Sequence, residues 1–156
     1  MKTRITILAI ITTCLFGCSQ STTTEGRISE CFEKYVETDF GNTKDFKEIT
    51  SINLIDSLDK TKMLSLCQTI DECSSILTPL QIIKASTFRM RFEQDTNVLK
   101  TYEIKVRMIE NKHSVVNIFY AIDHNGNINI QDHKLHIDET PELYKDFFEF
   151  AKELTK

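Results

Sequence analysis

The fold class of this 156-residue chain is decided by residues 101–131, TYEIKVRMIENKHSVVNIFYAIDHNGNINIQ. Apolar and charged residues alternate in its first part: Tyr102, Ile104, Val106 and Met108 are apolar, and Glu103, Lys105 and Arg107 are charged. Alternation with a period of two predicts a strand that buries one face and exposes the other. Further strands are expected over 114–123 and 127–131, so the stretch predicts an antiparallel sheet.

The turn before residue 127 can close in two registers. A two-residue Asn125-Gly126 turn pairs Ile122 with Asn129, whereas a three-residue loop over 124–126 pairs Ile122 with Ile128. The longer loop sets apolar side chains opposite each other and places Gly126 at a left-handed bulge position. It is therefore the predicted register. Residues 133–138, HKLHID, are expected to form a last short strand.

A second alternation follows Pro79, where Phe88, Met90 and Phe92 are interleaved with Arg89, Arg91 and Glu93. It predicts a strand beside the one at 102–108. Elsewhere, apolar residues recur at steps of three and four, which predicts helices. The predicted helices are 28–40, 44–59 with Thr43 as cap, 61–77 ended by Thr78-Pro79, and 140–156 with Thr140 as cap and Pro141 first in the helix. Gly41 is expected to end the first of them.

These elements give an α+β fold with N-terminal helices, an antiparallel meander of three to five strands and a C-terminal helix, in a single domain over 28–156. The order of elements over 28–131, with its D-x-N-G-x-I hairpin, resembles cystatin-like and nuclear-transport-factor-like domains. That resemblance implies a curved sheet wrapped on helices. It also implies a pocket that is either an active site or a packed core.

The N-terminus reads as a secretory signal. Lys2 and Arg4 precede an uncharged apolar run over 5–16. Twelve helical residues span roughly 18 Å, short of the roughly 30 Å hydrocarbon core of a bilayer. The run is therefore interpreted as a signal peptide over 1–17 rather than as a transmembrane helix.

The end of this run, Leu15-Phe16-Gly17-Cys18, resembles the lipobox of bacterial lipoproteins, with Phe16 bulkier than usual. The resemblance implies that Cys18 carries a diacylglyceryl group, that cleavage precedes it, and that its new amino group is acylated. Two or more acyl chains anchor a protein stably, where one chain is marginal. Because Ser19 is not the aspartate that retains lipoproteins in the inner membrane, the resemblance favours the outer membrane. Residues 18–27 are predicted to be a flexible spacer.

Loss of the signal removes Lys2 and Arg4, so the formal charge of −4 becomes −6. This acidic balance gives no support for nucleic-acid binding. Of the remaining thiols, Cys31 is expected to pair with Cys67 or Cys73, one pair at most, or all three are small buried side chains. Cys67 and Cys73 do not pair on one helix, because six residues rise about 9 Å.

Arg89, Arg91, Lys105 and Arg107 are the candidate partner-binding residues. If the two alternating segments are neighbouring strands, these bases cluster on the outer face of the sheet, and cross-strand ion pairs are the alternative. No catalytic motif is found, and no cofactor or metal is expected. The segment from Asp123 to Asp132 resembles a calcium loop only superficially, since Gly126 stands fourth and Lys134 twelfth. The four histidines are interpreted as solvated side chains.

These observations predict a lipid-anchored envelope protein that binds a protein partner without catalysis, as an inhibitor, an immunity factor or an accessory of an envelope machine. Two alternatives stay open. One is a small pocket enzyme or ligand carrier of the transport-factor-like type, with a carboxylate or histidine inside the sheet. The other is a structural envelope component.

Overall fold

A computed structural model describes residues 23–38, 45–134 and 140–155 of the chain. The elements follow in the order α2 (Thr24–Thr38), β1 (Phe46–Asp59), α3 (Lys60–Glu72), η1 (Ser74–Ile76), α4 (Pro79–Glu93), β2 (Val98–Glu110), β3 (His113–His124), β4 (Asn127–Gln131) and α5 (Glu142–Glu153). The strands form one antiparallel sheet in the order β1-β2-β3-β4. The predicted α+β class, with a meander and a C-terminal helix, is confirmed.

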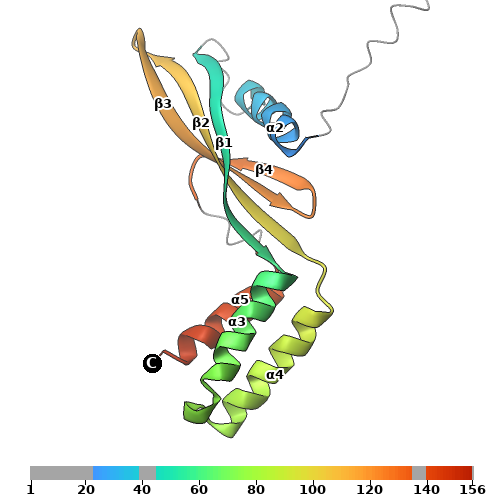
Figure 1. The fold of residues 1–156 in the computed structure, drawn as a ribbon. Helices are drawn as coiled ribbons and strands as arrows, with labels where there is room; N and C mark the ends of the chain where they lie inside the picture. Colours follow the sequence, from blue (N-terminus) through green and yellow to red (C-terminus); the bar gives the residue numbers. More distant parts are fainter. Residues whose placement is uncertain (1–22, 39–44, 135–139, 156) are drawn as a thin grey trace, which may run out of the picture.

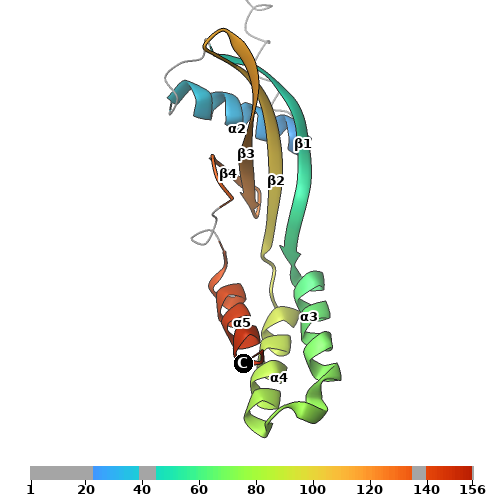
Figure 2. The same cartoon turned by 90° about the vertical axis from the view of Figure 1, so that its left-hand side faces the viewer.

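The molecule is elongated and has two lobes (Figure 1). The sheet lobe comprises α2 and β1–β4, and the helical lobe comprises α3, η1, α4 and α5. Strand β1 runs directly into α3, and α4 returns to β2, so the α3–α4 hairpin extends from one end of the long β1–β2 pair. Helix α5, far away in the sequence, completes the helical lobe (Figure 2).

The sheet lobe is closed by α2, which packs across one face of the sheet (Figure 2). The helix presents Ile28, Phe32 and Val36, all buried, at the predicted spacing of four. They meet the inward-facing residues of the sheet, which are Tyr102, Ile104, Val106, Met108, Phe119, Ala121 and Ile130. The alternation of β2 is thus confirmed.

The helical lobe has a separate, largely aromatic core. Its fully buried members are Met63, Cys67, Phe92, Tyr144 and Phe147. Rings of α4 and α5 meet edge to face, with the Phe92 centroid 5.3 Å from Phe147 and 5.6 Å from Tyr144. Such tilted contacts add to the stabilisation from apolar burial. Each lobe therefore has its own core.

The helix predicted over 44–59 is wrong, because this segment is strand β1. Phe46, Ile49 and Ile52 pair with Met108, Val106 and Ile104, and all three pack on the core of the sheet lobe. The register shifts once between Phe46 and Ile49 and once between Ile49 and Ile52, so in each of these steps three residues of β1 match two of β2. Since a bulge inserts one extra residue, a strand with regular bulges places an apolar residue inward at every third position. That spacing imitates a helix.

The strand predicted around 88–93 is also wrong, because Pro79–Glu93 is helix α4. Thr78 Oγ1 accepts a hydrogen bond from Gln81 N, the Gln81 side chain accepts one from Thr78 N, and Pro79 is the first helical residue. This capping box starts a helix where the sequence was interpreted as a stop. The inner face of α4 carries Gln81, Ala85, Phe88 and Phe92 at steps of four, three and four.

The predicted hairpin register is wrong as well. Ile122 pairs with Asn129, and Asn125 and Gly126 form a two-residue turn with φ of 51° and 87°. Positive φ at both central residues is typical of a type I′ turn. The prediction assumed that only one face is buried here, but Ala121 and Ile122, on opposite faces, are both fully buried. An apolar residue opposite Ile122 is therefore not required.

A polar junction connects the two lobes. The hydroxyl of Tyr144, on α5, lies 2.7 Å from Asp95 Oδ2 and 3.0 Å from Asn97 O, in the segment between α4 and β2. At the β3–β4 turn, Asn125 N donates to Val98 O at 2.9 Å and Asn125 Oδ1 accepts from Val98 N at 2.7 Å. The junction thus ties α5, the start of β2 and the hairpin turn together.

The ends of several elements differ from the predicted ones. Helix α2 begins at Thr24, so residues 24–27 of the predicted spacer are helical. Helix α5 has Pro141 at its N-cap and no side-chain cap, so the predicted Thr140 cap and first-turn Pro141 are wrong. Residues 133 and 134 are not in a strand. The signal peptide, Cys18, Gly41, Thr43 and the rest of the predicted last strand lie outside the described residues. Among the helices that the structure describes, none has the length and apolarity needed to span a bilayer.

Candidate functional site

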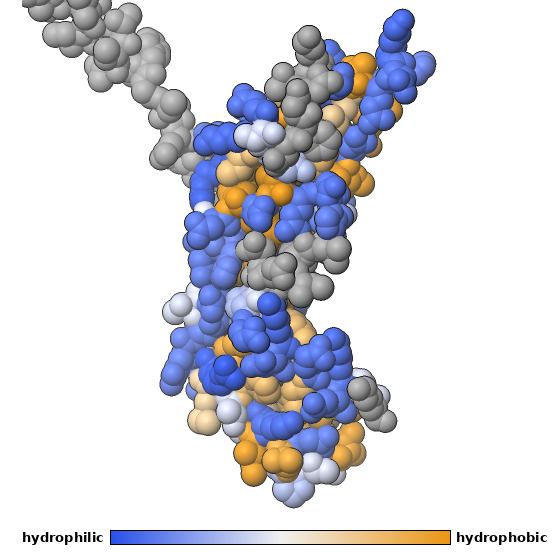
Figure 3. Space-filling model, turned by 180° about the vertical axis from the view of Figure 1, so that it is seen from behind, coloured by the Kyte–Doolittle hydropathy of each residue, from blue (hydrophilic) through white to orange (hydrophobic). Residues whose placement is uncertain are grey.

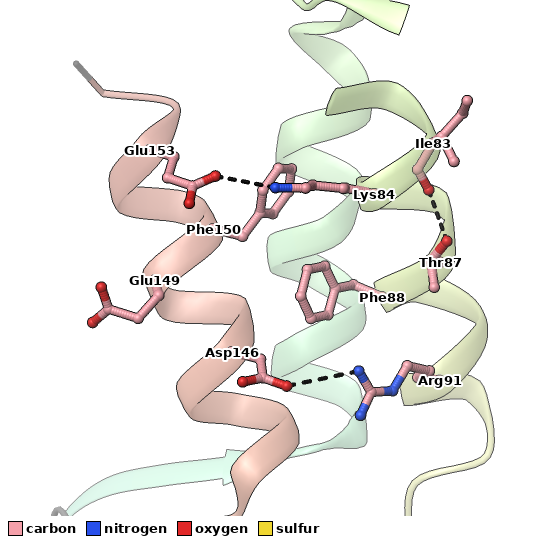
Figure 4. Close-up of a pocket in the computed structure, with 9 residues that line it drawn as sticks. All are labelled: Ile83, Lys84, Thr87, Phe88, Arg91, Asp146, Glu149, Phe150 and Glu153. Carbon is pink, nitrogen blue, oxygen red and sulfur yellow. Dashed lines mark hydrogen bonds and ion pairs between the residues drawn. The ribbon is translucent and has the colours of Figure 1, made fainter. Parts of the chain in front are cut away.

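A groove of about 320 Å³ runs between α4 and α5 on the helical lobe (Figure 4). The rings of Phe88 and Phe150 form its apolar floor, with centroids 5.4 Å apart and ring planes 26° apart. The groove is lined by Ile83, Lys84, Thr87, Phe88, Arg91, Asp146, Glu149, Phe150 and Glu153. A concave apolar floor with polar groups at its edge is the usual form of a binding site.

The two walls of the groove carry opposite charges. Lys84 and Arg91, seven residues apart on α4, form one wall, and acids of α5 form the other (Figure 4). Lys84 Nζ lies 3.3 Å from Glu153 Oε2, and Arg91 Nη1 lies 3.8 Å from Asp146 Oδ2. The pairing of Lys84 with Glu153 and of Arg91 with Asp146 also shows that α4 and α5 run antiparallel.

These bridges are weak. Their four side chains are 47–59% exposed, and ion pairs in water contribute about 0–1 kcal/mol each. Lys84 Nζ also lies 5.8 Å from the centre of the Phe150 ring, a distance suited to a cation–π contact. Opening the groove to a ligand therefore costs little, while the Phe88–Phe150 floor stays in place.

An exposed apolar stripe lies next to the groove on α4. Leu80, Ile83 and Met90 are 65%, 62% and 58% exposed, and with Thr87 they recur at steps of three, four and three. This is the spacing of the contact seam of a coiled coil. Two more exposed residues, Ile76 and Ile82, lie nearby in the sequence, and apolar side chains gather at the lower end of the helical lobe in Figure 3. Helix α4 therefore has two apolar faces, of which only the inner one is covered within the described structure.

The four bases predicted to cluster on the sheet lie in different lobes. Arg89 and Arg91 belong to α4, and Arg89 pairs with Asp71 at 3.0 Å. Lys105 and Arg107 are on the outer face of β2, as predicted. The shared cluster was wrong, because it depended on a strand at 88–93.

On the sheet, the two bases engage neighbouring acids. Arg107 pairs with Glu48 of β1 at 2.5 Å, and Lys105 pairs with Glu103 at 3.5 Å. The Arg107–Glu48 pair is the cross-strand ion pair named as the alternative. On β3, the exposed residues Val116 and Ile118 stand opposite Arg107 and Lys105. This face is thus a second, smaller patch of mixed character.

The three cysteines of the described chain are free thiols. Cys31 packs against the core of the sheet lobe, whereas Cys67 is buried in the core of the helical lobe, so these two belong to different cores. Cys73 is exposed. Burial, with a smaller contribution from Asp71, raises the pKa of Cys67 from its usual 9.0 to about 11. This thiol is therefore protonated at neutral pH.

In the described ranges, no three His, Cys, Asp or Glu side chains stand close enough together to hold a metal ion. His124 lies 3.3 Å from Asn97 Oδ1 at the junction, and His133 contacts Asp132. His136 lies outside the described residues. In the segment that resembles a calcium loop, Asp123 Oδ1 accepts a hydrogen bond from Gly126 N at 2.7 Å, which stabilises the turn.

Sequence reasoning missed the groove because it missed α4. The available signal was Thr78-Pro79-Leu80-Gln81, which fits both a capping box and proline at the first helical position. Reading a helix from Pro79 would have placed Lys84 and Arg91 on one face, two turns apart. No protein-family model, curated protein sequence or solved structure matches this chain.

Proposed function

We propose that this chain is a lipid-anchored protein of the bacterial envelope that binds a protein partner, without catalysis, through its helical lobe. The observation that carries the proposal is the exposed stripe on α4, where Leu80, Ile83 and Met90 lie beside an apolar groove. Contiguous exposed apolar surface on a soluble domain marks an interaction site more often than a scattered apolar residue does.

The anchor in this proposal is Cys18, within Leu15-Phe16-Gly17-Cys18. It would attach the folded lobes to a membrane through a spacer of a few residues before α2. Replacing Cys18 with serine should release the protein from the envelope, and the mass of the native N-terminus should fit a triacylated cysteine. An unmodified thiol in the membrane-bound protein would contradict the anchor.

The site supports binding rather than acid–base chemistry. A pocket enzyme of the kind considered above needs a carboxylate or histidine buried against an apolar cavity, where its pKa is shifted toward neutrality. The acids that line the groove between α4 and α5 belong to its exposed rim instead, as the half-exposed side chains of Asp146 and Glu153 illustrate. A purely structural envelope component would need no such groove.

Paired substitutions test which lobe binds. The protein is purified from its native cell through a C-terminal tag, as wild type and as Ile83→Asp/Met90→Asp. The matched control is Val116→Asp/Ile118→Asp on the sheet, where the side chains are also exposed. We expect the helical pair to lose the co-purifying partner and the sheet pair to retain it. The opposite result would assign binding to the sheet face.

A further inference from the structure

The groove has the dimensions of a short helix-binding site. Lys84 and Arg91 are separated by seven residues on α4, and so are Asp146 and Glu153 on α5. Two turns of helix rise about 10 Å, so the two ion pairs bracket a floor about two turns long. Amphipathic helices dock in grooves of this kind through apolar residues spaced three, four and seven apart.

The exposed stripe widens this site on the side of α4. Ile83 and Thr87 belong both to the stripe and to the lining of the groove, so the stripe borders the groove along its α4 side. In the coiled-coil spacing of this stripe, Lys84 and Arg91 each follow an apolar contact position directly. These are the flanking positions whose charges select a partner helix.

We propose that the groove between α4 and α5 binds an amphipathic α-helix of a protein partner. Its apolar stripe lies over the Phe88–Phe150 floor, with Ile83 at the edge of the contact. One flank of the bound helix carries acidic residues that face Lys84 and Arg91, and the other carries basic residues that face Asp146 and Glu153. This inference rests on the proposed function and names the chemistry of the partner.

Charge disfavours an antiparallel pairing of α4 with a second copy of this chain. In an antiparallel pair of α4 stripes, related by a two-fold axis perpendicular to the helices, Lys84 of one copy would lie opposite Arg91 of the other. Like charges at such positions are destabilising. An anionic membrane surface fits no better, because the α5 wall presents acids.

A bound helix must replace the two ion pairs that now cross the groove, and this requirement favours a helix with one acidic and one basic flank. A partner with two acidic flanks would satisfy Lys84 and Arg91 but would meet the acids of α5. A partner with two basic flanks would meet the bases of α4. Only one flank of each sign replaces both existing bridges, so preference among partners is set chiefly by the mismatched wall.

Three synthetic 18-residue helices test the proposal, all with leucine at steps of three and four. Their flanks are one glutamate and one lysine edge, two glutamate edges, or two lysine edges. Binding to the full mature protein is measured by fluorescence anisotropy at about 0.15 M salt. We expect the mixed helix to bind at least about fivefold more tightly than either single-sign helix. Equal binding of all three, or binding of none, would overturn the proposal.

Two variants locate the effect. Asp146→Lys/Glu153→Lys replaces the two acids that face Lys84 and Arg91 with bases and leaves Glu149 as the remaining acid of the lining. This variant should transfer the preference to the helix with two glutamate edges. Ile83→Glu should weaken binding of the mixed helix by about tenfold or more, whereas the matched control Ile118→Glu on β3 should not change it. An unchanged preference in the double variant would contradict the assigned polarity.

Two further measurements test whether a second copy of the chain or a membrane occupies the groove instead. The helix proposal would be overturned if sedimentation showed a dimer that Ile83→Glu dissociates. It would also be overturned if vesicles of phosphatidylethanolamine and phosphatidylglycerol bound the protein in a way that depends on Ile83. If no peptide binds but native capture still depends on Ile83 and Met90, the proposed function survives and the helical partner fails. If native capture is indifferent to those residues, the proposed function fails as well.

Discussion

The two lobes of this protein differ in the side chains that they expose. On the sheet lobe, the bases Lys105 and Arg107 of β2 pair with neighbouring acids, as Arg107 pairs with Glu48. On the helical lobe, α4 exposes an apolar stripe and a groove whose ion pairs span an apolar floor. The four predicted bases are divided between the lobes, and in both lobes they pair with nearby acids. What distinguishes the helical lobe is its larger exposed apolar surface.

The largest expected effect separates the two cores. Phe92→Ala in the helical lobe and Phe32→Ala in the sheet lobe should each cost about 3–5 kcal/mol of unfolding free energy, because both rings are fully buried. Hydrogen exchange should show the Phe92 variant losing protection mainly in α3, α4 and α5, and the Phe32 variant mainly in the sheet lobe. Equal loss in both lobes from either variant would mean a single cooperative unit.

Two cysteines, Cys67 and Cys73, differ in burial and should therefore differ in reactivity. The rise in the pKa of Cys67 from 9.0 to about 11 lowers its thiolate fraction at pH 8 by about 100-fold, and burial blocks access further. Iodoacetamide at pH 8 should therefore label exposed Cys73 at least about 100-fold faster than Cys67, measured by peptide mass spectrometry. Similar rates would show that the helical core opens readily.

The same thiol makes stability depend on pH. Below pH 9, Cys67 is protonated in both states, so its contribution is complete. Between pH 9 and 11 the unfolded chain releases this proton and the folded chain keeps it, so the free energy of unfolding falls as pH rises. Burial also raises the pKa of Tyr144 and Tyr102, which adds to the fall at higher pH. Denaturant titrations should show a smaller fall from pH 9 to 11 in Cys67→Ala; an identical fall would contradict the assignment.

The polar junction is expected to contribute less than either core. Tyr144→Phe keeps the ring packed but removes the hydroxyl that contacts Asp95 and Asn97. Because the part-buried partners lose a hydrogen bond, the unfolding free energy should drop by about 1–3 kcal/mol. Chemical denaturation measures this drop. A change near zero would mean that water replaces the hydroxyl and that the junction does not hold the lobes together.

The smallest effect is expected at the β3–β4 turn. Gly126 has φ of 87°, so Gly126→Ala should lower the unfolding free energy by about 1 kcal/mol. The added methyl group meets Arg27 Nη2 at 3.8 Å, an ordinary contact, so backbone conformation and not crowding causes the loss. Gly26→Ala in α2 is the control and should not destabilise the protein, since alanine is favoured in helices. Equal losses would contradict the turn geometry.

The elements predicted correctly from the sequence are those in which the apolar spacing follows the buried face of the element. Helix α2 and strand β2 each bury one regular face, so their apolar spacing identified them. Strand β1 failed because its register shifts gave Phe46, Ile49 and Ile52 a helical spacing. Helix α4 failed for the opposite reason: Phe88 and Phe92 face the core while Met90 is exposed, which imitates alternation.

The site was harder to predict than the fold. Lys84 and Arg91 acquire their neighbours only when α5 packs against α4, and no local pattern relates residues 84 and 153. The hairpin register likewise depended on burial of Ile122 on the second face of the sheet, which is a tertiary property. Only the Thr78–Gln81 capping box was a local signal that could have changed the outcome.

Photo-crosslinking in the native cell tests the central claim most directly. Benzoylphenylalanine is introduced singly at Ile83 or Met90 on α4 and at Val116 or Ile118 on β3, all of them exposed side chains. If the helical lobe is the binding surface, both α4 positions give one shared protein adduct and both β3 positions give none. An adduct confined to the β3 positions would contradict that claim.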